Sequence, residues 1–395
     1  MSALPRQVKA LGVVSLLTDA SSEMIYPLLP ALLTGPLRAG PVFLGLVEGA
    51  AEAVSSVLKV AAGRASDRRP RRKPLVVAGY ALSSLARPLV ALASAPVHVL
   101  VVRILDRVGK GTRGAPRDAL LAEVTDPRQR GRAFGFHRAM DHAGAVVGPL
   151  LASALLWLHL DLRAVFALAA VPAVASLAVL LAGVREPPRR TPPPASGVAG
   201  DAPLGPPLRR YLGVLALFTL GNSSDAFLLL RAQDAGVPLA AVPALWAFHH
   251  VVKAAAGTHG GMLADRIGAR PTIVAGWGVY AAAYAGFAVA HAAWHVWALF
   301  GVYGLFHALT EGAERALVAD LALPQARGRA YGYFHAVTGA MLLPASLLTG
   351  AVWQWKGPAA AFGLGAALAG TAAVLLPAAV DASRSPRHEG SPRHP

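Results

Sequence analysis

The sequence predicts an all-α integral membrane protein, with twelve transmembrane helices in two pseudo-symmetric six-helix bundles. Three observations predict this fold class. First, 55% of the 395 residues are hydrophobic and 15% are charged, whereas soluble domains carry about 25% charged residues. Second, apolar blocks recur from Leu11 almost to Val380, and several exceed the ~20 residues that a helix needs to cross a bilayer. Third, segments of the first half return in the second.

Each apolar block is expected to form a helix, because helices satisfy every backbone hydrogen bond within one membrane-crossing segment. The apolar run after Lys9 lacks the small-residue cleavage pattern of a signal peptide, so we expect the first helix to remain in the mature protein. The chain contains no cysteine, which excludes disulfides and thiolate chemistry. The expected spans are residues 10–33, 42–62, 75–93, 96–116, 133–158, 162–184, 209–232, 241–262, 271–291, 294–318, 331–353 and 359–381.

A polar stretch rich in proline and arginine separates the two halves. It contains the run EPPRRTPPP at 186–194, whose proline content prevents a packed core. We therefore expect an N-terminal bundle at 1–184, a cytoplasmic linker at 185–208, a C-terminal bundle at 209–381 and a disordered cytoplasmic tail at 382–395.

The two halves resemble each other at several places. RGRAFGF at 130–136 returns as RGRAYGY at 327–333, and SSE at 21–23 returns as SSD at 223–225. Because six is an even number of crossings, both copies enter the membrane from the same side and are related by an axis along its normal. Glu23 and Asp225 are therefore equivalent positions of a duplicated six-helix unit.

Basic residues gather in alternate connections between the expected helices. They lie at 68–73, 128–132, 185–210, 266–270, 327–329 and 384–393. By the positive-inside rule these connections and both termini are cytoplasmic, in a multi-pass protein of the plasma (cytoplasmic) membrane. The net charge of +16 is then an orientation signal and a contact with anionic lipid, and we expect no nucleic-acid partner.

Two loops carry a recognisable signature. GRASDRRPRR at 63–72 and GMLADRIGAR at 261–270 resemble the Gly-x-x-x-Asp-Arg-x-Gly-x-Arg loop of the major facilitator superfamily, with Pro70 at a usual glycine position. RILDRVG at 103–109 is similar to the fourth-helix arginine motif of that superfamily, with Asp106 and Arg107 in place of glutamine and glycine. GAVVGP at 144–149 resembles the fifth-helix element of its drug:proton antiporter branches. The resemblance covers the whole chain and implies a transporter whose first, fourth, seventh and tenth helices line the cavity.

The two signature loops are expected to latch one conformation. A carboxylate at a helix end can pair with nearby arginines or accept hydrogen bonds from a helix N-terminus. The alternative is a solvated surface pair, worth at most ~1 kcal/mol. The latch candidates are Asp67, Arg68, Arg71, Asp265, Arg266 and Arg270. Gly144, Gly148 and Pro149 are expected to serve close helix packing.

A cytoplasmic gate is a second hypothesis. Arg117 and Asp118 occupy the positions of Glu314 and Arg315 in the other half, with the charges reversed. Across the pseudo-twofold axis Arg117 could meet Glu314 and close the cytoplasmic side.

Charged residues inside the membrane cost at least ~2.5 kcal/mol each and usually face a cavity or a partner. On the fourth helix Arg103, Asp106, Arg107, Lys110 and Arg113 lie on one helical face, which predicts a charged stripe along a water-filled centre. The third helix carries only Arg87 and is expected at the periphery. The candidates for substrate binding and proton coupling are Asp19, Glu23, Arg103, Asp106, Arg107, Asp225, Glu311 and Glu314.

Three further charges require partners. Glu48 and Glu52 share one face of the second helix, where interhelical ion pairs are the structural interpretation. Lys253 lies well inside the eighth helix and must find a carboxylate or lose its proton.

Several functions are excluded by missing motifs. His249 and His250 are adjacent and His137 and His142 are five residues apart, so neither pair has the i, i+4 spacing of a metal site. GKGT at 109–112 ends a membrane helix and does not follow a strand, so it is no nucleotide loop. No nucleophile–base arrangement stands out, so we expect no enzyme and no catalytic residue. The expected partners are a small-molecule substrate and the lipid bilayer, the protein is expected to be a monomer, and no cofactor beyond a proton gradient is expected.

These observations predict a secondary transporter that moves a small organic solute by alternating access, with proton-coupled efflux as the first hypothesis. Acidic residues on the first and seventh helices favour a cationic substrate, whereas the basic stripe favours an organic anion, so an organic-anion transporter is the alternative. A non-transporting membrane receptor on the same fold is a further alternative.

Overall fold

The expected all-α membrane fold is confirmed by the computed structural model, which describes residues 4–68, 71–126, 129–186, 205–322 and 327–381. Eight stretches of the described helices are long and apolar enough to cross a membrane. Joining consecutive elements, and dividing the last helix at Gly357, gives twelve long helical segments within these ranges. The expected tail at 382–395 and the part of the expected linker at 187–204 lie outside the described residues.

The elements fall into two bundles. The first contains α1 (Arg6–Ile25), η1 (Tyr26–Leu28), α2 (Leu29–Thr34), α3 (Pro41–Arg68), α4 (Lys73–Ala86), η2 (Arg87–Leu92), α5 (Pro96–Glu123), α6 (Arg130–Trp157), α7 (Leu162–Leu168) and α8 (Ala170–Gly183). The second contains α9 (Pro206–Gly221), α10 (Ala226–Asp234), η4 (Leu239–Ala241), α11 (Val242–Ile267), α12 (Ala269–Val289), α13 (Ala293–Leu321) and α14 (Arg327–Asp381).

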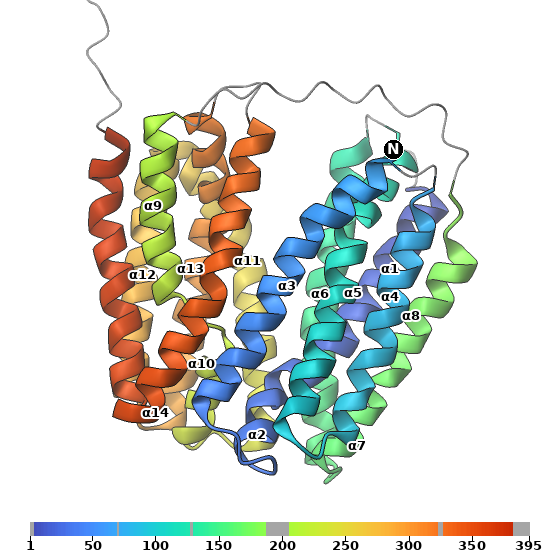
Figure 1. Ribbon diagram of the computed structural model, residues 1–395, viewed down its shortest axis with the longest axis horizontal. Helices are drawn as coiled ribbons and strands as arrows, with labels where there is room; N and C mark the ends of the chain where they lie inside the picture. The colour runs from blue at the N-terminus through green and yellow to red at the C-terminus, as the bar shows by residue number, and fades with distance from the viewer. Residues whose placement is uncertain (1–3, 69–70, 127–128, 187–204, 323–326, 382–395) are drawn as a thin grey trace, which may run out of the picture.

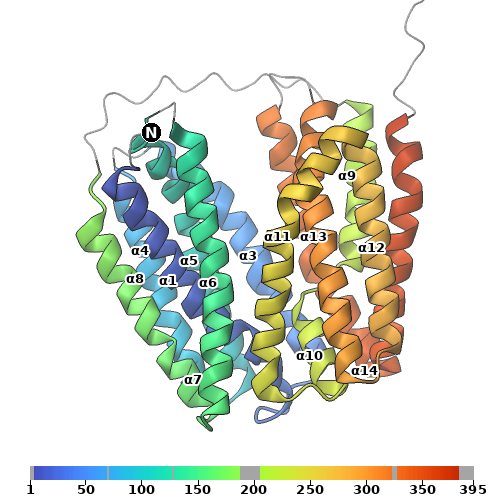
Figure 2. The same cartoon turned by 180° about the vertical axis from the view of Figure 1, so that it is seen from behind.

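The bundles meet at one end and diverge at the other (Figures 1 and 2). They diverge at the end that holds the N-terminus and the start of α9, here called the terminal end. Helices α3 and α14 pack together between the bundles, as do α6 and α11. Nearer the opposite end the hydroxyl of Ser153 on α6 donates a hydrogen bond to the carbonyl of Ala240 in η4 at 2.5 Å. The two bundles therefore contact each other through these helices and lie further apart at the terminal end.

The α3–α14 contact depends on glycine. A Cβ atom at Gly45 would meet the carbonyl group of Ser346, and one at Gly49 would lie 2.8 Å from the Cα atom of Leu343. In lipid, helices associate through such close packing because no hydrophobic force separates protein from solvent.

Two of the expected helices are interrupted within their length. α1 passes into the 3-10 turn η1, where Pro27 lacks the N–H that would continue the α-helix. The seventh expected helix, at 209–232, is not continuous, because α9 ends at Gly221 and α10 begins at Ala226. The intervening sequence NSSD favours a break, since serine and asparagine side chains offer the backbone local hydrogen bonds that compete with a helix.

The break is stabilised from two sides. The side-chain oxygen of Ser224 accepts a hydrogen bond from the backbone N–H of Ala226 at 3.3 Å. The hydroxyl of Tyr280 on α12 donates to the carbonyl of Gly221 at 2.9 Å. Broken helices inside a membrane are tolerated where they are buried in protein or line a cavity, and this one carries Asp225.

Candidate functional site

A cavity of about 310 Å³ lies between the bundles, beside η1 and the break at 222–225. Because its walls come from α1, η1, α3, α5, α11, α13, α14 and the break, both halves of the chain contribute to it. Its described lining residues are Glu23, Tyr26, Glu48, Glu52, Arg107, Asn222, Ser223, Ser224, Asp225, Trp246, His250, Tyr303, His307, Leu342 and Ser346.

Two carboxylates in this cavity bond to aromatic donors. The indole N–H of Trp246 donates to Glu23 Oε2 at 2.8 Å, and the hydroxyl of Tyr303 donates to Asp225 Oδ1 at 2.5 Å. Among the described residues, neither carboxylate forms an ion pair with Lys, Arg or His. Two repeat-equivalent acids therefore face one cavity without a cationic partner.

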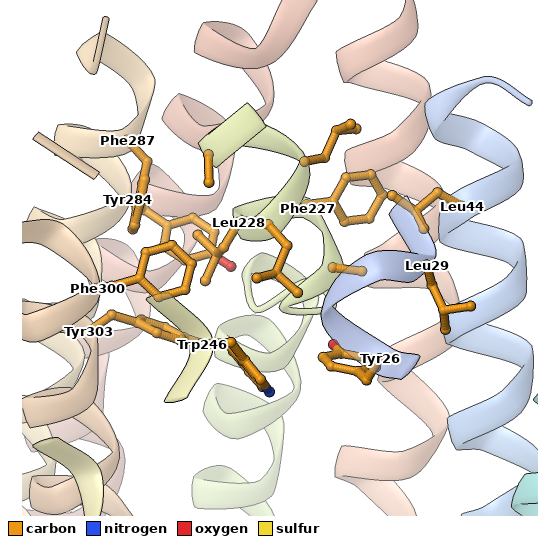
Figure 3. Packing of buried hydrophobic residues seen from close by; sticks show 14 of the residues in the cluster. Tyr26, Leu29, Leu44, Phe227, Leu228, Trp246, Tyr284, Phe287, Phe300 and Tyr303 are labelled. Atoms are coloured by element: carbon orange, nitrogen blue, oxygen red, sulfur yellow. The ribbon is translucent and has the colours of Figure 1, made fainter. Parts of the chain in front are cut away.

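Aromatic rings surround these acids. The rings of Tyr26 and Trp246 lie 5.4 Å apart between their centroids, one from each bundle, and Figure 3 shows them side by side. Tyr26 Oη also lies 3.5 Å from the side-chain oxygen of Ser224. The ring of His249 stacks between Trp246 and Tyr303, at 5.1 Å from each.

Two arginines of the charged stripe on α5 are paired with glutamates of α3. Arg103 forms a bidentate pair with Glu48 on α3, at 3.0 and 2.7 Å, and Arg107 Nε lies 2.7 Å from Glu52 Oε1. The interhelical ion pairs expected for the two glutamates are therefore present.

The expectation that the whole stripe faces a water-filled centre is wrong. Of its five members only Arg107 lines the cavity in the described structure. Asp106 is buried toward η2, where Arg87 Nε lies 2.6 Å from its Oδ1. Arg113 turns toward α4 and donates to the hydroxyl of Ser83 at 2.6 Å. The five charged side chains cover a wide part of the α5 surface, so some of them contact α3 and others contact α4 and η2.

The helix that carries Arg87 was expected at the periphery, and its exposed Leu85, Leu89 and Leu92 side chains agree with this, but Arg87 itself points into the protein. Besides its pair with Asp106, its Nη1 atom donates to the carbonyl of Thr18 on α1 at 2.8 Å. The Arg87 side chain is buried and links η2 to α1 and α5. Asp19, one turn of α1 from the cavity, forms no hydrogen bond or ion pair with the described residues.

A second cavity of about 390 Å³ lies nearer the terminal end, between α6, α11 and α13. Lys253 and Glu311 both line it, and Lys253 Nζ lies 2.5 Å from Glu311 Oε1. The expected carboxylate partner of Lys253 is therefore found. His307 lines this cavity as well as the first one.

The gate residues are not paired with each other in this conformation. Arg117 donates to its neighbour Asp118 at 3.0 and 2.8 Å, and Glu314 accepts from the indole N–H of Trp277 at 3.1 Å. Arg315 lines the second cavity. The diverging bundles separate α5 from α13 here, so closure by Arg117 and Glu314 stays a prediction about another conformation.

The latch can be followed only in part, because the side chains of Asp67 and Arg68 lie outside the described residues. Arg71, Asp265 and Arg266 are exposed, and Arg270 is partly buried. Beside these residues, the structure shows contacts that were not predicted from the sequence. Arg72 Nη1 lies 2.9 Å from Glu123 Oε1. The backbone N–H groups of Arg72 and Lys73, at the start of α4, donate to Glu186 at the start of the linker.

The two glycines of the fifth-helix element pack against α1. A Cβ atom at Gly144 would meet the carbonyl oxygen of Leu16, and one at Gly148 would meet the backbone of Ala20. Pro149, between them and the end of α6, is buried. The described residues contain no group of three or more His, Asp or Glu side chains that could hold a metal ion.

Sequence reasoning missed the aromatic and imidazole parts of the site. Trp246 lies on α11, and Tyr303 and His307 lie on α13. The contacts of Trp246 with Glu23 and of Tyr303 with Asp225 join different elements, whereas His307 and Glu311 are one turn apart on α13. Their one sequence signal is the density of aromatic and histidine residues in the eighth and tenth expected helices.

Comparisons with known proteins agree with this fold. The family model of the Major Facilitator Superfamily matches residues 11–249 and 213–395. An uncharacterized MFS-type transporter of Methanocaldococcus jannaschii is 35% identical over 380 residues, which are 94% of each chain. The multidrug resistance protein MdtH of Proteus mirabilis is 32% identical over 159 residues, 39% of this chain and 40% of its own.

Among solved structures, a bacterial homolog of the human lysosomal transporter Spinster, inward-facing and unoccupied, covers 96% of each chain with a TM-score of 0.71 and 16% identity. This likeness concerns the fold. The family model and the full-length relative carry the assignment, and the chain therefore belongs to the major facilitator superfamily and is a multi-pass membrane transporter.

Proposed function

We propose that this transporter exports an aromatic or amphipathic organic cation in exchange for protons. The observation that carries the proposal is that Glu23 and Asp225 both line one cavity. They come from equivalent positions of the two halves, and each bonds to an aromatic donor without a cationic partner. A bound cation would supply the positive charge that this site lacks.

The charge balance favours a cation over an anion. Glu48 and Glu52 are neutralised by Arg103 and Arg107, which leaves Glu23 and Asp225 uncompensated in the lining. To bind one of these arginines, an organic anion would have to break the Arg103–Glu48 or the Arg107–Glu52 ion pair. Breaking a buried ion pair typically costs about 3–5 kcal/mol.

The rings of Tyr26, Trp246 and Tyr303 support a cation with an aromatic or apolar body. Each lines the cavity, and a cation over an aromatic face gains about 0.5–2 kcal/mol, more when water is excluded. The match to a multidrug resistance protein over part of the chain supports export of such compounds.

Competition for one carboxylate would couple the two fluxes. Burial disfavours the ionised form of an acid, so a carboxyl group in the membrane interior can hold a proton when no cation is bound. A proton and an organic cation then exclude each other from the same oxygen atoms. Alternating exposure of the site to each side converts this exclusion into exchange.

The orientation follows from the basic loops. We propose that the terminal end faces the cytoplasm, that both termini lie there, and that the protein works as a monomer in the plasma membrane. The bundles diverge at that end, so the conformation described here is inward-facing (Figure 1). No cofactor enters the cycle, and the proton gradient supplies the driving force.

The test is transport in proteoliposomes with ethidium, a fluorescent aromatic cation, and carboxyfluorescein, an organic anion. An imposed pH gradient should drive ethidium but not carboxyfluorescein. Asp225→Asn and Glu23→Gln should abolish this pH-driven movement. Asp234→Asn, which neutralises an exposed acid on α10 away from the cavity, is the matched control and should behave as wild type.

Three results would contradict the proposal. Movement of carboxyfluorescein alone would establish the organic-anion alternative. Full pH-driven transport in Asp225→Asn and Glu23→Gln would remove both residues from the coupling. No pH-driven movement of either probe would reject proton-coupled exchange and favour uniport or a receptor function.

A further inference from the structure

One histidine lies between the two cavities. His307 on α13 is the residue common to the described linings of both cavities. Toward the first cavity its ring contacts that of Tyr303, with 5.0 Å between the centroids, and the Tyr303 hydroxyl bonds to Asp225 at 2.5 Å. Toward the second cavity its Nδ1 atom lies 3.9 Å from Glu311 Oε1. The substrate site and the second cavity are therefore linked through one imidazole.

Access to water differs along this line of groups. The side chain of Glu311 is 45% exposed and that of His307 is 19% exposed. Water in the second cavity, which lies nearer the terminal end, therefore has more access to Glu311 than to His307. A proton leaving Asp225 toward that end would pass His307 before it reaches the more exposed groups.

The charged groups around His307 come from α6, α11, α13 and the break that carries Asp225. α11 presents His249, whose ring lies 5.4 Å away, and Lys253, which is paired with Glu311 of α13. Across the second cavity α6 presents Arg138 and His142. Arg315 of α13 also lines the second cavity. Asp225 of the break and His250 of α11 line the first cavity. Because Glu311 is held by Lys253, it can orient the imidazole of His307 while remaining a carboxylate.

Imidazole has the chemistry that such a position requires. It is the one side chain whose unperturbed charge change falls between pH 5 and 8, and its two nitrogens allow one to gain a proton while the other loses one. We propose that His307 carries the proton between Asp225 and the second cavity. This inference rests on the proposed proton coupling and adds the route to it.

The transfer balances as one proton in and one proton out. The O–H bond of the Asp225 carboxylic acid breaks, and the proton passes through the Tyr303 hydroxyl or a water of the first cavity to one imidazole nitrogen. The N–H bond at the other nitrogen then breaks, and its proton goes to water in the second cavity. Asp225 ends as a carboxylate, ready for a cation, and His307 ends neutral.

The test measures proton uptake without any substrate. Purified protein in detergent is shifted rapidly from pH 8 to pH 6, and uptake is followed with a pH indicator by stopped flow. After the fast titration of surface groups, wild type should show a slower phase from the buried acids. His307→Gln should slow this phase by roughly 10²-fold, the usual contribution of a positioned proton-transfer group. His142→Gln, which removes another imidazole of the second cavity, is the control and should match wild type.

Equal rates in His307→Gln and wild type, or no slow phase in wild type, would overturn the proposal. Exchange of ethidium across the membrane at equal pH shows whether the variant is intact, because exchange requires no proton release. Ethidium exchange should remain detectable in His307→Gln, because Glu23 and Asp225 are still present to bind the cation, while pH-driven transport is lost. If His307→Gln does not exchange ethidium, His307→Asn replaces it with a smaller side chain and the same expected results. If wild type shows no pH-driven transport, the proposed function fails, and proton uptake still decides the role of His307.

Discussion

The bond between Trp246 and Glu23 joins the two bundles across the first cavity, so it should bias the transporter toward the conformation described here. Trp246→Phe removes the indole N–H that donates to Glu23 at 2.8 Å but keeps an aromatic ring beside Tyr26 and His249. A hydrogen bond to a charged group contributes about 1.5–3 kcal/mol. If the bond is lost when the bundles separate around the cavity, the variant should shift the equilibrium by roughly 10- to 150-fold toward the opposite conformation.

The absence of cysteine makes this shift measurable. Nitroxide labels at Ala139→Cys on α6 and Ala254→Cys on α11 would face each other across the second cavity, and pulsed electron resonance reports their distance. We expect one main long distance in the otherwise unchanged protein and a much larger short-distance fraction with Trp246→Phe. Trp294→Phe, at an exposed indole on α13, is the control.

A double-mutant cycle isolates the hydrogen bond from other effects of the tryptophan. In a Glu23→Ala background the acceptor is absent, so Trp246→Phe should change the distance distribution no further. If Trp246→Phe leaves the distribution unchanged in the wild-type background, the reasoning about this bond is refuted. If it shifts the distribution equally in both backgrounds, the effect comes from ring packing instead.

Three other predictions concern packing, buried charge and the gate. Gly148→Ala should destabilise the purified protein by about 1–3 kcal/mol, since its Cβ meets the neighbouring backbone; thermal unfolding checks this against Gly135→Ala on the same helix, where a Cβ meets nothing within 4 Å. Asp106→Asn should cost about 3–5 kcal/mol, because it leaves buried arginines uncompensated, and unchanged thermal stability would show that the pair is dispensable. Charge reversal at Arg117 or at Glu314 alone should reduce ethidium transport, and the double reversal should restore it; a double variant no more active than the single ones would reject the gate.

The fold and one part of the site could be predicted because the bilayer restricts the possible structures. Lipid leaves the backbone few solutions, so apolar blocks of sufficient length predict helices. The repeat then pairs Glu23 with Asp225 at equivalent places of the two halves, which the structure brings to one cavity. Neither step required knowledge of which helices touch.

The sequence by itself therefore determined an all-helical, two-bundle membrane fold and the acids equivalent in its two halves. Only the tertiary structure decided which charges remain unpaired, because ion pairs such as Arg103–Glu48 and Arg87–Asp106 join helices far apart in the chain. It also decided the break before Ala226, where a tyrosine from α12 satisfies a freed carbonyl. A helical face specifies the direction of a side chain, but the neighbouring helix that meets it determines whether that side chain binds a partner or remains available to a substrate.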